Sequence, residues 1–238
     1  MVIDLQKEQE ATLKRPRLKY SLLAKLMFWL MDFIYGNKIT LSKIKFLEVL
    51  ARIPYQAWEI KQYWGLITGY NNTHKRENAE GLIKWAREAQ DNEYWHLMVA
   101  SEKMKQDNVK ESWFWYHFVP PIAAFKYTLF SRLLALISIK SAWKFNAMFE
   151  DHAEHAFMQF VKDNPQLENE QVESVAVQDG RGPAQGHYPS WADVFRRIGL
   201  DERDHMNESL RRCGMEDKVL PYTSDNESGA LAGRIHGE

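Results

Sequence analysis

Residues 92–97, Asn-Glu-Tyr-Trp-His-Leu, and residues 201–205, Asp-Glu-Arg-Asp-His, each contain a glutamate followed three positions later by a histidine. On an α-helix, side chains three positions apart lie on the same face, one turn from each other. A carboxylate and an imidazole placed in this way can bind one metal ion together. One such pair is expected by chance roughly once in a chain with this many Glu and His residues, so the evidence lies in the presence of two.

Two single glutamates complete the pattern. Glu48 and Glu150 lie in two other segments with helical periodicity, so the order along the chain is Glu, Glu-x-x-His, Glu, Glu-x-x-His. This is the ligand set of di-iron carboxylate bundles, in which four helices each turn a Glu inward and two add a His. An oxygen-rich site without thiolates suits iron or manganese better than zinc. The sequence therefore predicts two iron ions (Fe2+/Fe3+) held at a catalytic centre by Glu48, Glu93, His96, Glu150, Glu202 and His205.

The rest of the pattern predicts an all-α fold. Four long segments are rich in Leu, Ala, Glu, Lys and Met and carry apolar residues at helical spacing. They cover about residues 41–70, 75–106, 133–163 and 189–212. A helix of about 30 residues is about 45 Å long, which suits a four-helix, ferritin-like bundle. We expect Pro54 to kink the first helix or to mark its opening turns.

Two further stretches are unusually apolar, at residues 20–35 and 113–139. The first is shorter than the roughly 20 residues that span a bilayer. The second contains His117, Lys126 and Arg132, and charges are costly at that depth. We therefore expect both to be amphipathic helices that lie in the membrane interface. A buried core position and a membrane span are the alternatives.

These features divide the chain into an N-terminal arm (residues 1–19), a di-iron bundle domain (20–215) that includes the two interface helices, and a C-terminal tail (216–238). We expect the tail to be disordered, because it is rich in Ser, Gly, Ala and Asn. A surface loop is expected at residues 179–183. Three cations of the arm are expected to meet anionic headgroups: Arg15, Arg17 and Lys19.

Composition limits the class of protein. The chain has 238 residues, with 31 Lys and Arg against 32 Asp and Glu, and this balance argues against a nucleic-acid partner. Its single cysteine, Cys213, excludes an intrachain disulfide and favours a reducing compartment. The arm mixes acids and bases and has no apolar signal core, so we expect neither a signal peptide nor a transit peptide.

Several motifs together resemble those of the alternative oxidase family. They are Phe-Leu-Glu at 46–48 with Ala-Arg-Ile-Pro-Tyr at 51–55, the stretch at 92–97, Glu-Asp-His-Ala at 150–153, and the stretch at 201–205. The resemblance covers about residues 41–213 and looks nearest the plastid terminal oxidase branch. It implies a di-iron quinol oxidase that reduces O2 to water without pumping protons. Its quinol would be ubiquinol or plastoquinol.

The resemblance also implies where such a protein acts. Members are peripheral (monotopic) membrane proteins that bind one leaflet and usually form homodimers. For this chain that would be the cytoplasmic or thylakoid-facing side of a membrane. Asn92 and Asp201 would be hydrogen-bonding partners of the metal ligands, and His152 is expected to have a similar supporting role. His152 with His155 could instead form an outer metal site. The quinol pocket would lie near Lys43, Leu47, Ala153, Ala156 and Phe157.

The departures from the family pattern fall in that pocket. Phe157 stands where the family has a redox-active tyrosine, and Ala156 stands where it has a threonine. Lys43 replaces an arginine of the family, so the positive charge is kept but the planar guanidinium group, which can donate two parallel hydrogen bonds, is lost. Because a phenyl ring cannot supply a hydrogen atom as a phenol can, we expect slow or incomplete turnover.

Two alternatives keep the metal site but change the function. The altered pocket is compatible with a di-iron oxygenase or desaturase that acts on a lipid-like substrate. A non-enzymatic iron-binding protein is the other alternative. Trp58, Trp64, Trp85, Trp95 and Trp115 are expected to be core or interface residues rather than electron carriers.

Overall fold

The computed structural model describes residues 3–178 and 188–223, and these contain eight α-helices and no β-strand. The α-helices are α1 (Leu5–Lys14), α2 (Leu22–Tyr35), α3 (Leu41–Gly69), α4 (Thr73–Gln106), α5 (Val119–Ile137), α6 (Ile139–Asp163), α7 (Val175–Gln178) and α8 (Trp191–Cys213). Three shorter turns are the π-helical η1 (Phe114–Phe118) and the 3-10 helices η2 (Pro165–Glu168) and η3 (Glu216–Lys218). The predicted all-α fold is confirmed.

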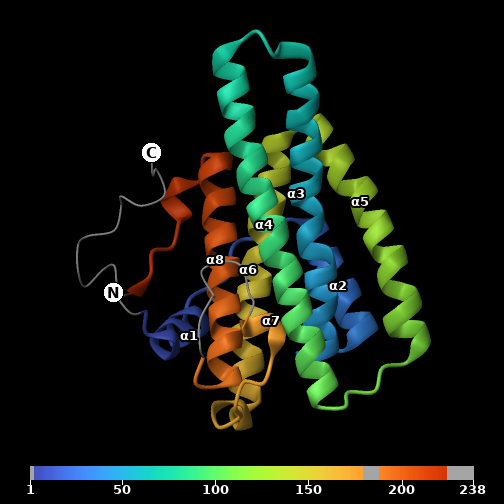
Figure 1. The fold of residues 1–238 in the computed structure, drawn as a ribbon, viewed down its shortest axis with the longest axis vertical. Helices are drawn as coiled ribbons and strands as arrows, with labels where there is room; N and C mark the ends of the chain where they lie inside the picture. The colour runs from blue at the N-terminus through green and yellow to red at the C-terminus, as the bar shows by residue number, and fades with distance from the viewer. Residues whose placement is uncertain (1–2, 179–187, 224–238) are drawn as a thin grey trace.

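The bundle consists of α3, α4, α6 and α8, which run side by side along the long axis of the molecule (Figure 1). The most extensive pairings are α3 with α4 and α6 with α8, and α3 also contacts α6. The core between them is apolar, and Trp58, Phe149 and Trp191 are among its largest fully buried side chains. Burying a large apolar side chain contributes about 1.5–3 kcal/mol to stability.

The beginnings of these helices are fixed by side-chain caps. Thr40, Asn72, Ser138 and Ser190 each accept a hydrogen bond from the backbone N–H three residues later, at the starts of α3, α4, α6 and α8. Each such cap stabilises a helix by about 1 kcal/mol. Gly214 ends α8 in the left-handed conformation, with φ of 75°.

One boundary differs from the expected one. Ser138 caps α6 and separates it from α5, so the stretch at 113–139 and the helix expected from residue 133 meet at a break at this residue. Pro54 lies inside α3, which continues for fifteen residues to Gly69. A proline inside a helix removes a backbone hydrogen bond, and the extensive packing of α3 against α4 stabilises the helix on both sides of it.

A glycine brings α6 and α8 close together. A Cβ atom at Gly199 would lie 2.9 Å from Met158 Cε and 3.3 Å from Phe157 Cβ. The missing side chain therefore lets the backbone of α8 approach α6 next to the turn that carries Glu202.

The N-terminal arm contains a helix that the sequence did not predict. Helix α1 packs on α6 and α8, away from α2 (Figure 1). Part of the expected disordered tail is also structured, because η3 forms and Asn207 of α8 exchanges hydrogen bonds of 2.8 Å with the backbone of Leu220. Residues 224–238 and the expected loop at 179–183 lie outside the described residues.

Helices α2 and α5 lie against the outside of the bundle and expose large apolar side chains. Leu22 and Phe33 of α2 are 86% and 71% exposed, and Ile137 of α5 is 75% exposed. Further exposed members of this apolar surface are Leu26, Trp29, Trp113, Phe125, Leu129, Leu133 and Leu136. No helix in the described part of the chain is both long and apolar enough to cross a membrane.

Candidate metal centre

The four bundle helices bring the six expected ligands into one buried cluster. Glu48 comes from α3, Glu93 and His96 from α4, Glu150 from α6, and Glu202 and His205 from α8, and all are at least nine-tenths buried. Their donor atoms form two groups, each with its atoms within 4.8 Å of one another. One group is Glu48, Glu93, His96 and Glu202, and the other is Glu93, Glu150, Glu202 and His205.

Glu93 and Glu202 belong to both groups, which gives the centre an approximate two-fold symmetry. His96 Nδ1 lies 2.9 Å from Glu202 Oε1, and His205 Nδ1 lies 2.8 Å from Glu93 Oε1. Each imidazole therefore lies beside the glutamate of the other Glu-x-x-His pair. Two metal ions could share these two carboxylates as bridges.

The donor atoms of the cluster fit a pair of divalent cations. The oxygens of Glu48, Glu93 and Glu202, and Nδ1 of His96 and His205, are buried and have no hydrogen-bond partner. Burying a polar group without a partner costs several kcal/mol, so such a set is expected only where something binds it. Four carboxylates carry four negative charges, which two divalent ions would balance. Oxygen and imidazole donors without a thiolate suit iron.

The protonation of the cluster reflects the same crowding of charge. Burial and the negative charge of Glu202 raise the pKa of Glu48 well above its usual value. Burial and the charges of Glu93 and Glu202 do the same to the pKa of Glu150. Burial alone would lower the pKa of His96, but the charge of Glu202 raises it well above its usual value. The metal-free cluster therefore retains protons, and metal binding would release them.

His96 is oriented by a carboxylate on its far side. Asp201 Oδ2 lies 3.2 Å from His96 Nε2, so Nδ1 is turned toward the metal centre. Asp201 is in turn held by Arg197, whose Nη2 donates to Oδ1 at 2.5 Å, and by Asn92, whose Nδ2 lies 3.5 Å from Oδ2. Arg197 and His96 lower the pKa of Asp201 to about 2 against the effect of burial, so this carboxylate is ionised.

Glu150 is oriented by residues that sequence reasoning missed. Its Oε1 accepts hydrogen bonds from Tyr55 Oη at 2.7 Å and from Asn146 Nδ2 at 2.8 Å. Asn146 Nδ2 also lies 3.3 Å from Ser209 Oγ. Helical spacing could have indicated both residues. Asn146 precedes Glu150 by four positions, so the two lie on the same face of α6. Tyr55 follows Glu48 by seven positions, so the two lie on the same face of α3.

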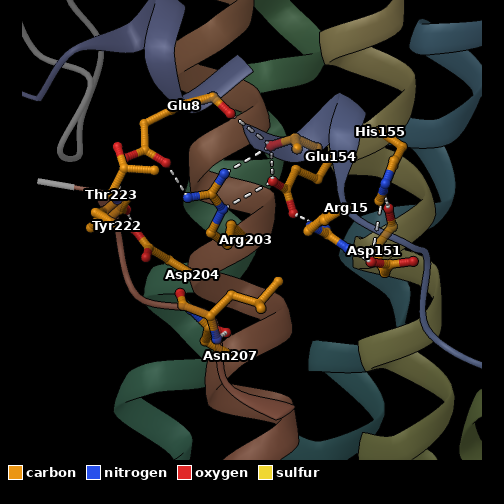
Figure 2. Close-up of polar contacts among 12 residues, drawn as sticks. Glu8, Arg15, Asp151, Glu154, His155, Arg203, Asp204, Asn207, Tyr222 and Thr223 are labelled. Carbon is orange, nitrogen blue, oxygen red and sulfur yellow. Dashed lines mark hydrogen bonds and ion pairs between the residues drawn. The ribbon is translucent and has the colours of Figure 1, made fainter. Parts of the chain in front are cut away.

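A second buried polar cluster joins the N-terminal arm to the segment of α8 that carries Glu202 and His205 (Figure 2). Arg203 donates to Glu8 Oε2 at 2.5 Å, to Thr12 Oγ1 at 2.8 Å and to Glu154 Oε1 at 2.9 Å. Glu8 Oε1 also accepts from the backbone N–H of Thr223 at 2.5 Å. One arginine thus ties α1, α6 and α8 together, and Glu8 adds the C-terminal segment.

The cations of the arm make contacts other than those expected. Arg15 donates to Asp151 at 2.6 Å and to Glu154 at 2.5 Å, and Arg17 Nη1 lies 3.1 Å from His152 Nδ1. Arg15 is thus paired within the protein, whereas Arg17 is exposed, and the expectation that these cations meet lipid headgroups stays a prediction.

His152 and His155 are part of the contact between the arm and α6. The ring of His152 stacks on Phe28 of α2 at 3.9 Å between centroids. His155 Nδ1 lies 2.7 Å from the carbonyl oxygen of Asp151. Burial lowers the pKa of both imidazoles, in His152 to about 3, so both are neutral. Among the described residues, neither belongs to a group that could hold a further metal ion.

The five residues expected around the substrate are all buried, but they do not line the main cavity. Lys43 Nζ is bonded to Asp32 and, at 2.8 Å, to the carbonyl oxygen of Gly36. Phe157 stacks on Phe195, and its ring lies 6.4 Å from that of His96. Leu47, Ala153 and Ala156 pack in the core.

The main apolar cavity lies instead between α2, α3, η1 and α5 and has a volume of about 620 Å³. Its lining is apolar except for Lys126 and Tyr127. Leu50 and Tyr127 form part of its wall near the metal centre, since the ring of Tyr127 stacks at 6.2 Å on Phe149, the neighbour of Glu150. The cavity therefore lies beside the exposed apolar helices, and Tyr127 connects its wall to the residue that precedes Glu150.

Comparison with known protein families gives one match, to the model described as Alternative oxidase, over residues 7–210. The matched region includes all six clustered residues and extends into α1, beyond the stretch where the motifs were noted. No curated protein matches the chain.

Proposed function

Since the chain belongs to the alternative oxidase family, we propose that it is a membrane-bound di-iron quinol oxidase that reduces O2 to water without pumping protons. The observation that carries this proposal is the pair of buried ligand groups that share Glu93 and Glu202. Glu48 and His96 would complete one iron site, and Glu150 and His205 the other. Two iron ions bound there would supply the electron exchange with oxygen.

The residues around the centre would hold it in place and keep water away. Asp201 fixes the ring of His96, and Tyr55 and Asn146 fix Glu150 Oε1. Such partners typically change metal affinity or activity 10–100-fold. Burial of all six ligands keeps bulk water from the site and strengthens each electrostatic contact there.

The substrate side of the proposal rests on the apolar cavity. Quinols of membranes carry long apolar chains, and the cavity between α2 and α5 is apolar and lies beside the exposed apolar surface of the same helices. Quinol would enter from one leaflet, with α2 and α5 in the membrane interface and the protein present as a homodimer. The hydroxyl of Tyr127 and the ammonium of Lys126 are the polar groups of the lining that could meet its head.

The direct test is oxygen uptake by purified, iron-loaded protein in detergent, with a short-chain quinol and cyanide present. Sustained uptake that the Glu93→Ala variant lacks supports the proposal. No uptake by protein that still holds two irons per chain would reject quinol as the substrate.

Membrane binding is tested separately with phospholipid vesicles. Replacing Leu26, Trp29 and Phe33 together by serine removes three large exposed side chains of α2 and should abolish sedimentation with vesicles. Val175→Ser, at a 64% exposed position on α7, is the matched control and should bind like the parent. Unchanged binding of the triple variant would contradict this orientation.

A second candidate is a di-iron oxygenase or desaturase that acts on a lipid-like substrate. The apolar lining of the cavity and the phenyl ring at position 157 favour it. Labelled O2 separates the two, because an oxygenase places one labelled atom in the organic product and an oxidase sends both to water. Uptake only in proportion to added iron would instead indicate an iron-binding protein.

A further inference from the structure

Electron counting suggests that a protein side chain takes part in the proposed reaction. Reduction of one O2 to two waters takes four electrons, whereas two Fe2+ ions that become Fe3+ supply two. The remaining electrons come from quinol, directly or through an oxidisable group beside the metals. A phenol that can pass its proton to a neighbour is the most suitable such group in this cluster.

Tyr55 is the phenol that contacts the ligands. It is fully buried, its hydroxyl donates to Glu150 Oε1 at 2.7 Å, and its ring centroid lies 5.4 Å from that of His205. The rings of Trp58 and Trp85 lie 5.0 and 5.4 Å from it and enclose the remaining edges. Tyr55 thus touches two ligands of the same iron site in a setting that excludes water.

Other aromatic residues near the centre are less suited. Phe157 has no hydroxyl. Tyr127 is buried, but its contacts are with phenylalanine rings, among them Phe149, and no hydrogen bond joins it to a ligand. Trp95 lies beside His96, but its indole N–H is bonded to the carbonyl oxygen of Ala176.

We propose that Tyr55 is a redox-active residue of this centre, a role that rests on the proposed function. In the step, the O–H bond of Tyr55 would break, its electron would go to the O2 that is being reduced at the centre, and its proton would move along the hydrogen bond to Glu150 Oε1. A neutral phenoxyl radical remains on Tyr55. Quinol would then return one electron and one proton, which restores the phenol and leaves a semiquinone, and the proton on Glu150 would pass to the water that forms.

The test uses full-length, iron-loaded protein, reduced, mixed with O2 and frozen within milliseconds for electron paramagnetic resonance. We expect an organic radical signal that narrows when the protein carries ring-deuterated tyrosine. Tyr55→Phe should remove the signal while two irons remain bound, and should slow quinol oxidation about 10–100-fold. Tyr63→Phe, at a 55% exposed position of the same helix, is the matched control and should keep both the signal and the rate.

A rescue variant separates the redox role from a merely structural one. Phe157 lies on the other side of the centre, with its ring 6.4 Å from that of His96. Tyr55→Phe combined with Phe157→Tyr returns a phenol to the centre without restoring the hydrogen bond to Glu150, so a regained signal supports the proposal. A radical that persists in Tyr55→Phe, or that disappears in Tyr63→Phe, overturns it. Wild-type protein that binds two irons and oxidises quinol without a tyrosine radical overturns this inference alone, whereas protein that binds no iron overturns the proposed function.

Discussion

The contact between the N-terminal arm and α8 gives the most quantitative prediction. Glu8→Ala removes the carboxylate that binds Arg203 and Thr223, in a pair whose side chains are 4% and 0% exposed. Breaking a buried pair by removing one partner costs about 3–5 kcal/mol. Arg203 keeps Glu154 and Thr12, so we expect the lower end, about 3 kcal/mol of unfolding free energy.

The same change should weaken the metal centre. Arg203 lies directly after Glu202 and holds α8 against α6, so a displaced guanidinium shifts the turn that carries two ligands. For a chain of this size about 3 kcal/mol corresponds to a fall in Tm of about 6–12 °C. Metal affinity should fall about 10–100-fold, as it does when other supporting groups are lost.

Urea unfolding of the metal-free protein measures the first effect, and competition with a chelator for Co2+ measures the second. Glu10→Ala is the matched control: Glu10 is on the same helix, is exposed, and pairs with Lys14 among the residues described, so its loss should leave the unfolding free energy almost unchanged. If Glu8→Ala and Glu10→Ala had equal unfolding free energies and equal Co2+ affinities, the arm would not support the centre, and the reasoning would be refuted.

Four further predictions follow from single contacts. Asp201→Asn should lower Co2+ affinity about 10–100-fold without a loss of helical circular dichroism, and an unchanged affinity would show that the carboxylate does not orient its imidazole. Burial lowers the pKa of His155 in the folded state, so only the unfolded chain takes up a proton at this residue as the pH falls below about 6.5. The stability of the protein should therefore decline in that pH range, and it should decline less steeply in His155→Gln. Measurement of Tm from pH 7 to 5 would test this. Gly199→Ala should cost about 1 kcal/mol in urea unfolding, because the new Cβ would lie 3.3 Å from Phe157 Cβ, whereas Met158 Cε at 2.9 Å is the end of a flexible side chain that can move; a neutral effect would show that this approach of α8 to α6 does not need a glycine. Phe157→Tyr should raise the rate of quinol oxidation, and no change would show that a phenol at this position is not limiting.

The bundle and its cluster could be predicted because both depend on periodicity. Helical spacing fixes which face of α4 carries Glu93 and His96, and the length of the helices leaves few ways to bury those faces. Tyr55 and Asn146 obey the same spacing, but nothing in an isolated Tyr or Asn distinguishes a buried donor from an ordinary core or surface residue. Their role became visible only when α3 and α6 were brought together.

The cavity and the arm could not be predicted for a different reason. The cavity is the space left between α2 and α5. The shape of its walls depends on how these two helices pack on the bundle, and no sequence pattern in either helix predicts that packing. The sequence of the arm is typical of a charged, solvated segment, and nothing in it distinguishes Glu8 from an exposed glutamate. Its burial depends on Arg203, which is 195 positions away in the sequence.

The metal-ligand cluster and the polar cluster around Arg203 have opposite effects on the stability of the metal-free fold. Four carboxylates facing one another repel, so the metal centre destabilises the fold that positions it whenever metal is absent. The attractions that oppose this repulsion lie one helical turn away, where Glu154 follows Glu150 by four positions and Arg203 adjoins Glu202. There Arg15 and Arg203 pair with Asp151, Glu154 and Glu8. Because this pairing fixes how α6 sits against α8, the ligands are aligned before metal binds, and metal binding need not supply the ordering of the helices.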